Sequence, residues 1–276
     1  MSTSLRIASL TLPSADLGAE NPLPDIGRTQ DIHSLAPLGP GIPDDERPYF
    51  AYGKVQSILP YRMQDGYTRK KTLREMPTIV LENDYLTATF TPQYGGKLWS
   101  LYDRQAGRDL IHANPVFQPA NLALRNAWTS GGVEWNIGTT GHTPLTLAPL
   151  HTEILELADG TPVLRMYEWE RLRQVCYQMD FWLPADSAHL YVRIRIHNPR
   201  AEEVPMYWWS NIAVDEYEHS RVIAPATQAY AFSYSAKGID LEPIPIKHGK
   251  DLSYPVNGPN DRDRKSGSAG MPRPIS

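Results

Sequence analysis

Short runs of alternating apolar and polar residues, separated by turn signals, restrict the fold of this chain more than any other feature. In residues 85–91, the apolar Leu86, Ala88 and Phe90 alternate with threonines, and residues 190–197 alternate strictly. A period of two places the two sets of side chains on opposite faces of a β-strand. No long stretch shows helical periodicity, so we predict an all-β protein built as an antiparallel β-sandwich.

The same patterns give an expected strand order. Asp159-Gly160 is a strong hairpin signal, and 25 prolines disfavour long helices. Residues 67–76 are charged and polar, which predicts a loop or short helix. One or two short strands are expected within 49–61. Further strands are expected at 5–12, 78–83, 85–91, 97–102, 110–117, 151–157, 163–171, 172–183, 190–197, 206–214, 221–224 and 229–234.

Composition along the chain predicts three regions. Residues 1–48 contain a first strand and then an irregular segment rich in Pro and Gly, for which plain disorder is the alternative. Residues 49–256 contain the β-sandwich domain. Residues 257–276 have almost no apolar side chains and are expected to form a disordered tail.

Charge and cysteine content exclude several protein classes. The net charge is -4 and the longest basic run is Arg69-Lys70-Lys71, so no nucleic-acid partner is expected. The single Cys176 excludes an internal disulfide framework and is expected to be a buried, inert thiol. Neither a signal peptide nor an apolar segment long enough to span a bilayer is present, which predicts a cytoplasmic protein without a membrane partner.

Residues 128–149 are the stretch most suggestive of a binding site. They combine four glycines with Trp128, Trp135, Glu134, Asn136 and His142. Indole rings offer flat apolar faces, while carboxylate, amide and imidazole groups supply hydrogen bonds and acid–base chemistry. This combination suits a sugar, which has apolar C–H faces and a ring of hydroxyls. The alternative is a glycine-rich loop whose tryptophans belong to the core.

Glu134 and His142 are the candidate catalytic residues. Glu134 stands between Val133 and Trp135, where partial desolvation would raise the pKa of its carboxyl toward that of a general acid. The alternative is a structural carboxylate that accepts bonds from loop N–H groups. A glycosidase also needs a second carboxylate, and the sequence does not choose among the candidates Glu168, Glu170, Asp180, Asp215 and Glu216.

Further residues are candidates for binding a ligand. Trp208 and Trp209 are adjacent on an expected strand and must point to opposite faces, so one belongs to the core and the other could stack on a sugar. Asn211 shares a face with Trp209. Arg125 could bind a carboxylate or sugar hydroxyls, or could be an ordinary surface arginine. No His, Cys or Asp cluster has metal-ligand spacing, and no cofactor motif is present, so neither a metal nor a cofactor is expected.

Several segments together resemble a known superfamily. Residues 81–86, 94–103, 114–124, 128–136 and 204–213 are similar to galactose-mutarotase-like supersandwiches, in particular to an uncharacterised bacterial domain family often followed by tetratricopeptide repeats. The resemblance implies a β-supersandwich and a carbohydrate ligand. Aldose mutarotases carry a histidine acid on the strand corresponding to 206–213, where this chain has none. Their glutamate base would fall beyond residue 276, so we expect an incomplete C-terminal part and no mutarotase activity.

Three hypotheses about function remain open. The first is a carbohydrate-active enzyme, a glycoside hydrolase or sugar epimerase, with Glu134 as acid or base. The second is a non-catalytic carbohydrate-binding module that uses Trp135, Asn136, His142 and Trp209. The third is an inactive fragment of a longer tetratricopeptide-repeat protein. Whether the chain is an enzyme is therefore undecided from sequence.

Overall fold

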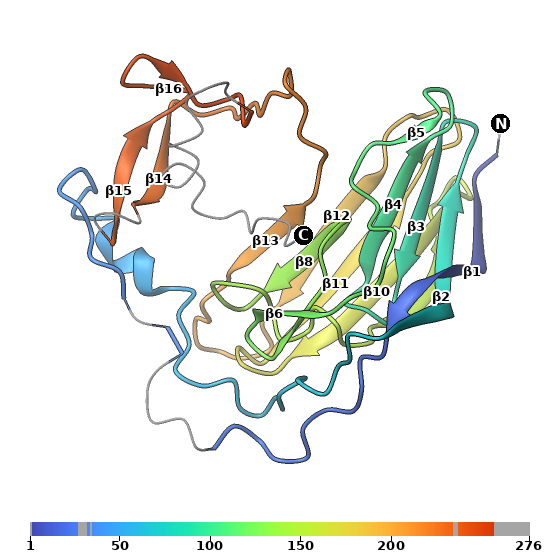
Figure 1. Cartoon of the computed structure of the whole chain (residues 1–276), viewed down its shortest axis with the longest axis horizontal. Coiled ribbons are helices and arrows are strands. Elements are labelled where there is room, and N and C mark those ends of the chain that lie inside the picture. Colours follow the sequence, from blue (N-terminus) through green and yellow to red (C-terminus); the bar gives the residue numbers. More distant parts are fainter. Residues whose placement is uncertain (1, 27–31, 34, 234–236, 257–276) are drawn as a thin grey trace. The chain divides into compact units, whose positions relative to one another are not determined.

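The computed structural model describes residues 2–26, 32–33, 35–233 and 237–256, and these are almost entirely β-structure. The all-β prediction is confirmed. The chain forms two compact units, which are described separately: residues 1–32 with 53–214, and residues 33–52 with 215–276 (Figure 1). Within the described ranges, no helix is both long and apolar enough to cross a bilayer.

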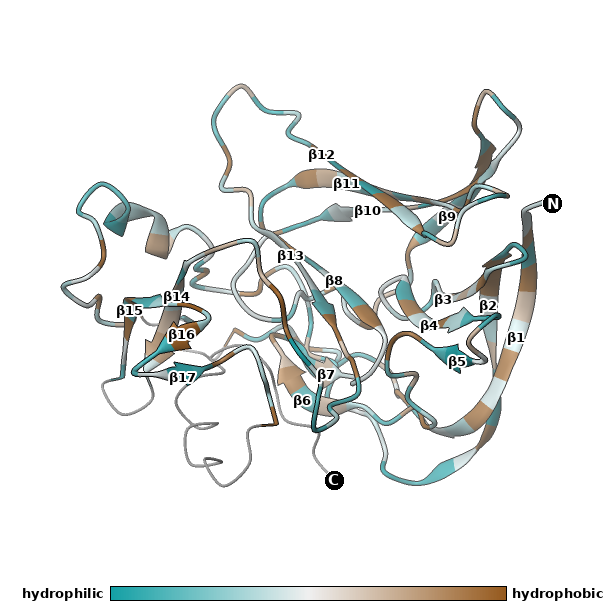
Figure 2. Ribbon diagram, turned by 90° about the horizontal axis from the view of Figure 1, so that it is seen from above, coloured by the Kyte–Doolittle hydropathy of each residue, from teal (hydrophilic) through white to brown (hydrophobic). Residues whose placement is uncertain are grey.

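The first unit is a sandwich of two antiparallel sheets, which Figure 2 shows as separate layers. The seven-stranded sheet has the order β1 (Ser4–Ala15), β2 (Lys71–Glu82), β3 (Leu86–Thr91), β4 (Lys97–Asp103), β8 (Val133–Ile137) and β13 (Trp208–Ile212), with β5 (Arg108–Asp109) beside β4. The four-stranded sheet has the order β12 (Tyr191–His197), β11 (Val175–Trp182), β10 (Pro162–Glu170) and β9 (His151–Glu156).

The main core lies between these sheets. The alternating Leu86, Ala88 and Phe90 of β3 are all buried in it. Phe90 meets Phe181 of the opposite sheet with ring centroids 4.7 Å apart. The face predicted from the period-two pattern is therefore the one that packs in the core, and burial of such large side chains stabilises each by about 2 kcal/mol.

A second, smaller core covers the opposite face of the seven-stranded sheet. Leu98 belongs to the main core, and its neighbour Trp99 belongs to the second, because adjacent strand residues point to opposite faces. Phe117, Ala127 and Leu147 pack there, from the segment that includes the hairpin β6 (Ala120–Ala123) and β7 (Asn126–Trp128). Residues 115–130 and 138–150, on either side of β8 in the sequence, therefore lie over the outer face of β4 and β8.

Four local predictions were wrong. Residues 49–61 contain no strand, and Arg47–Ala51 instead form a short 3-10 helix with a proline in its first turn. Residues 71–76 belong to β2, because the whole of β1 pairs with β2 from Lys71 to Glu82. Residues 110–117 are not a strand, since Ile111 and Phe117 belong to different cores. Residues 221–224 form no strand either; Val222 donates a backbone hydrogen bond to Ser253.

The second unit contains two small hairpins. Its strands are β14 (Gln228–Ser233), β15 (Gly238–Pro243), β16 (Ile246–Lys247) and β17 (Lys250–Asp251). Phe50 from the 3-10 helix packs edge-on against Tyr230, with ring centroids 4.9 Å apart. The expected tail at 257–276 lies outside the described residues.

Candidate functional site

The pairing of β8 with β13 gathers four polar or aromatic side chains on one face of the sheet. Glu134 lies opposite Asn211, and Asn136 lies opposite Trp209. Residues that are directly paired, or two apart on one strand, share a face. This face is the one covered by residues 115–130 and 138–150, whereas the neighbouring Trp208 packs against the main core.

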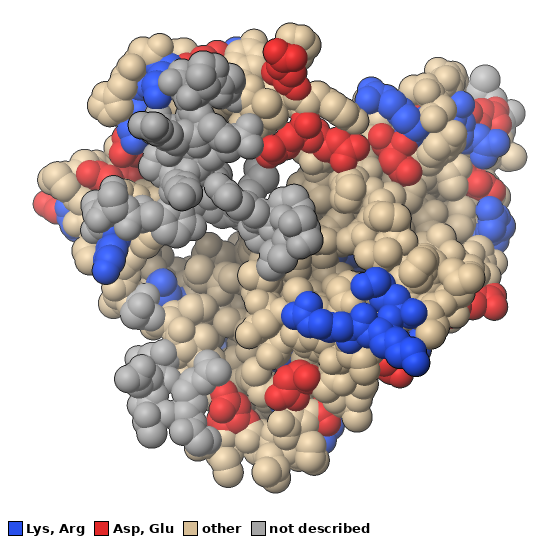
Figure 3. All heavy atoms as spheres, viewed as in Figure 1, with Lys and Arg blue, Asp and Glu red and all other residues tan. Residues whose placement is uncertain are grey.

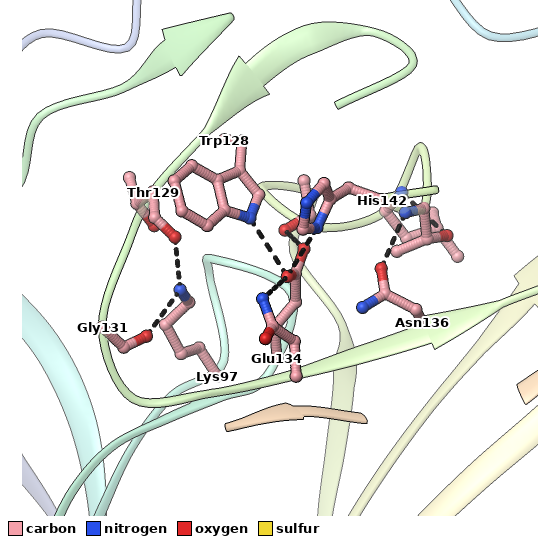
Figure 4. Close-up of polar contacts among 11 residues, drawn as sticks. Lys97, Trp128, Thr129, Gly131, Glu134, Asn136 and His142 are labelled. Atoms are coloured by element: carbon pink, nitrogen blue, oxygen red, sulfur yellow. Dashed lines mark hydrogen bonds and ion pairs between the residues drawn. The ribbon is translucent and has the colours of Figure 1, made fainter. Parts of the chain in front are cut away.

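Glu134 lies at the centre of a dense hydrogen-bond network (Figure 4). Its carboxylate accepts bonds from the indole N–H of Trp128 at 3.0 Å, the hydroxyl of Thr146 at 2.5 Å and the amide of Asn211 at 3.4 Å. The Nδ1 atom of His142 lies 2.8 Å away. Only 3% of Glu134 is exposed. The carboxylate is therefore fully buried, and its charge is satisfied by donors from four directions.

The expectation of a raised pKa at Glu134 is wrong. Burial alone would raise the pKa of its carboxyl. The hydrogen bond from His142, the charges of His142 and Lys97, and the bond from Thr146 together outweigh burial. They lower the pKa to about 2. Glu134 is thus an anion at neutral pH, which suits an orienting group and not a general acid.

Lys97 is the positive partner that sequence reasoning missed. Its ammonium group donates to the carbonyl oxygens of Thr129 at 2.7 Å and Gly131 at 3.0 Å, and lies 5.8 Å from the ring centroid of Trp128. Burial lowers its pKa to about 8, although the nearby Glu134 opposes this shift. Lys97 therefore ties the turn before β8 to the site. The sequence could have indicated this role, because Lys97 lies two residues before Trp99 on the same strand and both side chains therefore point to the covered face.

His142 is largely buried and keeps a small contact with solvent. Its side chain is 11% exposed, and its ring is tilted against Trp128 and Trp209, with centroid distances of 5.2 and 5.4 Å. Because Glu134 is ionised, Nδ1 carries the proton of their shared hydrogen bond. Among the described residues, none forms a hydrogen bond with the other ring nitrogen, Nε2. The imidazole is thus oriented by a carboxylate and presents a lone pair.

Asn136 and Trp209 contribute buried N–H groups. The side-chain oxygen of Asn136 accepts a hydrogen bond from the backbone N–H of Thr143 at 2.8 Å, which holds the residue after His142. The amide nitrogen of Asn136 and the indole nitrogen of Trp209 are both buried without a hydrogen-bond partner in the part of the chain that the structure describes. Each unpaired donor costs about 1–3 kcal/mol.

Two predicted binding residues lie elsewhere. Arg125 is 6% exposed, and its guanidinium donates to backbone oxygens of Arg62 and Pro144 and to the carboxylate of Glu20. All three of its guanidinium nitrogens therefore hold loops of the protein together. Trp135 points into the main core, where its indole N–H donates to Gly96 at 3.0 Å and its ring packs on Phe181. Period-two alternation within β8 explains why it faces away from Glu134.

The candidate second carboxylates are also occupied elsewhere. Glu170 is buried and accepts bonds from the backbone N–H groups of Leu172 and Arg173. Asp180 accepts bonds from Arg165 and Arg193, which lower the pKa of its buried carboxyl to about 2. Glu168 accepts a hydrogen bond from the backbone N–H of Trp169. Asp215 and Glu216 belong to the second unit. Within the described ranges, no group of three or more His, Cys, Asp or Glu is arranged to hold a metal ion.

Comparison with known proteins identifies the family. Residues 53–268 match the family described as a domain of unknown function, DUF5107. The chain belongs to the DUF5107 family. Its fold is similar to that of a TPR-domain containing protein from Parabacteroides distasonis ATCC 8503, with a TM-score of 0.68 and 17% sequence identity. The match covers 91% of this chain and 38% of the other, so this chain spans well under half of that protein.

A cavity of about 240 Å³ also exists in this DUF5107 domain, beyond the end of β8. It is lined mainly by apolar residues. Its one charged lining residue, Arg173, already donates to the carbonyl oxygens of Gly138 and Lys54. The lining includes neither Glu134 nor His142. The polar network is therefore the better candidate site, since it holds the groups that can exchange protons.

The low pKa of Glu134 predicts acid sensitivity of this DUF5107 domain. A carboxyl whose pKa is about 2 in the fold and 4.5 in the unfolded chain stabilises the fold above pH 4.5. This contribution, on the order of 3 kcal/mol, is lost as the pH falls from about 4.5 toward 2. Urea unfolding of the wild type and Glu134→Gln between pH 2 and 6 measures it. The free energy of unfolding of the variant should fall less steeply, and parallel curves would contradict the assignment.

Proposed function

We propose that this domain binds a carbohydrate at the Glu134 network and that His142 is its acid–base group. The observation that carries the proposal is the geometry of His142. Its imidazole lies between two tryptophan rings, with Nδ1 bonded to a buried carboxylate and Nε2 unpaired among the described residues. A carboxylate that orients an imidazole in this way fixes which of the two ring nitrogens can accept a proton.

The chemistry that suits this arrangement is proton transfer to and from a sugar hydroxyl. As the bond between C1 and the ring oxygen breaks, the anomeric hydroxyl would become a carbonyl and pass its proton to Nε2 of His142, which would deliver it to the ring oxygen. Ring closure on the other face of C1 would reverse these steps, and Glu134 would stabilise the imidazolium formed in between. Sugar epimerisation through opening and closing of the ring requires such a step. Hydrolysis by a carboxylate pair is less well supported, because Glu170 and Asp180 are already bonded elsewhere in the sandwich.

A second, less specific argument for a sugar ligand comes from the fold. The two antiparallel sheets agree with the galactose-mutarotase-like supersandwich that residues 81–103 and 204–213 resemble. The histidine of mutarotases is missing from β13, and His142 would supply the acid–base group from a different segment.

The test is a sugar screen on the wild type and two histidine variants. Binding of monosaccharides and oligosaccharides is measured by saturation-transfer NMR, and turnover by anomer exchange and by release of reducing ends. We expect His142→Gln to lower turnover by about 10²–10⁴-fold while the fold is retained. His151→Gln is the matched control, because this exposed histidine lies on β9 of the other sheet. Equal turnover in both variants would refute the role of His142.

A non-catalytic binding module is the second candidate. The observation in its favour is that all hydrogen bonds of Glu134 are made within the protein, which suits a rigid anchor as well as an enzyme. For this function the wild type would bind a sugar in the screen and convert none. In that case His142→Gln would change affinity alone.

A further inference from the structure

The two unpaired N–H groups beside His142 are the feature of the site that the proposed function does not yet use. Asn136 and Trp209 are direct partners across the β8–β13 pairing, so their side chains stand next to each other on the covered face. Asn136 is 0% exposed, and the indole nitrogen of Trp209 is also buried. The ring of His142 packs against Trp209. Both nitrogens therefore lie beside the candidate acid–base group.

The chemistry of these two groups is determined by their surroundings. The oxygen of Asn136 accepts the backbone N–H of Thr143, so the amide nitrogen is the end that remains unpaired. An indole N–H can only donate. Together the two side chains present hydrogen-bond donors and no acceptor. A ligand group that satisfies both must therefore supply acceptor oxygens.

We propose that Asn136 and Trp209 bind the carboxylate of an acidic sugar, with one oxygen for each donor. This inference rests on the proposed carbohydrate function and names its substrate class. A carboxylate offers an acceptor oxygen to each of the two donors from one rigid group, whereas two separate hydroxyls would be needed to do the same. The negative charge of Glu134 is already balanced by Lys97 and shared among four donors. Bonds from N–H groups to a charged acceptor are also stronger than bonds to a neutral one.

The surface near the site supports an anionic ligand. Figure 3 shows Lys and Arg side chains gathered where β6 and the first residues of β2 lie. Arg69, Lys70 and Lys71 are all exposed in this part of the sequence. Lys71 bonds to Gln118, just before the hairpin that carries Trp128, and Tyr67 bonds to Asn126 within it. These positive charges would attract an acidic sugar toward the site.

Entry to the two donors requires a local movement. Both nitrogens are buried, although Trp209 and Asn211 are themselves partly exposed and His142 keeps a small exposed fraction. Gly138 and Gly141, with φ angles of 83° and 88°, border the short segment that leads to His142. A bound sugar would displace the His142 ring from Trp209, while the hydrogen bond between Nδ1 of His142 and Glu134 would remain.

The test compares acidic sugars with their neutral parents. Galacturonate and glucuronate are titrated against galactose and glucose by calorimetry, with ¹⁵N NMR of the Asn136 amide and the Trp209 indole. We expect the acidic sugars to bind about 10- to 100-fold more tightly and to shift both nitrogen signals. Trp209→Phe removes one donor and should abolish most of that preference. Trp169→Phe, at an exposed tryptophan on β10, is the matched control and should retain it.

The possible results separate this inference from the proposed function. Equal binding of acidic and neutral sugars, or an undiminished preference in Trp209→Phe, would overturn the carboxylate site and leave the carbohydrate function standing. Failure of all four sugars to bind would overturn both. If Trp209→Phe does not fold, the wild-type nitrogen signals decide, because signals that do not shift on addition of galacturonate also refute the site.

Discussion

Replacing Glu134 by leucine is expected to lower the free energy of unfolding of the sandwich unit by about 3–5 kcal/mol. The leucine would leave the donors of Trp128, His142, Thr146 and Asn211 without their common acceptor, and Lys97 without its anion. Urea unfolding followed by tryptophan fluorescence measures this loss. All seven tryptophans lie in the first unit, so the signal reports that unit alone.

Glu134→Gln is the matched control for the leucine variant. It keeps the shape and one acceptor oxygen of the side chain and removes only the charge, so we expect a smaller loss of about 1–3 kcal/mol. A loss below about 1 kcal/mol for the leucine variant would mean that the four donors find other partners. The network would then contribute little to the fold.

Gly132→Ala is expected to destabilise the same unit by about 3 kcal/mol or more. Gly132 has a φ of 66°, which side chains other than glycine rarely adopt. An added Cβ would also lie 2.3 Å from the carbonyl oxygen of Leu98 on the neighbouring strand β4. Because that atom is backbone, relief of the clash requires β4 and β8 to separate. Urea unfolding followed by tryptophan fluorescence gives the magnitude.

Gly160→Ala separates the two causes. Gly160 has a φ of 83° in the hairpin between β9 and β10, but no heavy atom lies within 4 Å of its added Cβ. Strain without a clash should cost about 1 kcal/mol. Equal losses in the two variants would show that the close approach of Leu98 has no energetic effect.

Local patterns in the sequence predict much of the sandwich, because its strands have one face in a core. Leu86, Ala88 and Phe90 alternate, and they are buried as expected. The pattern fails where pairing with a distant strand decides the structure. Residues 71–76 look polar, yet they are strand because β1 supplies hydrogen bonds along their whole length. No pattern within residues 71–76 themselves indicates that they pair with β1, which lies far away in the sequence.

In the candidate site, too, local sequence patterns predict some features, and contacts between distant residues decide the others. Its key residues Glu134, Asn136 and His142 lie within one stretch, so their composition alone singled them out. The direction of the pKa shift at Glu134 depends on Lys97 and Thr146, which no local pattern links to it. The orientation of Trp135 into the main core has a simpler explanation. Recognising β8 as a strand would have placed Trp135 on the face opposite Glu134.

The late position of β13 in the chain has a consequence for synthesis. The ribosome makes the residues of β8 long before those of β13, since proteins are built from the N-terminus. A nascent chain that ends before β13 already contains Lys97, Glu134 and His142 but lacks Trp209 and Asn211. Pairings between such distant segments form slowly. The network is therefore completed only when the final strand of the large sheet docks, because a partly made chain lacks Trp209 and Asn211.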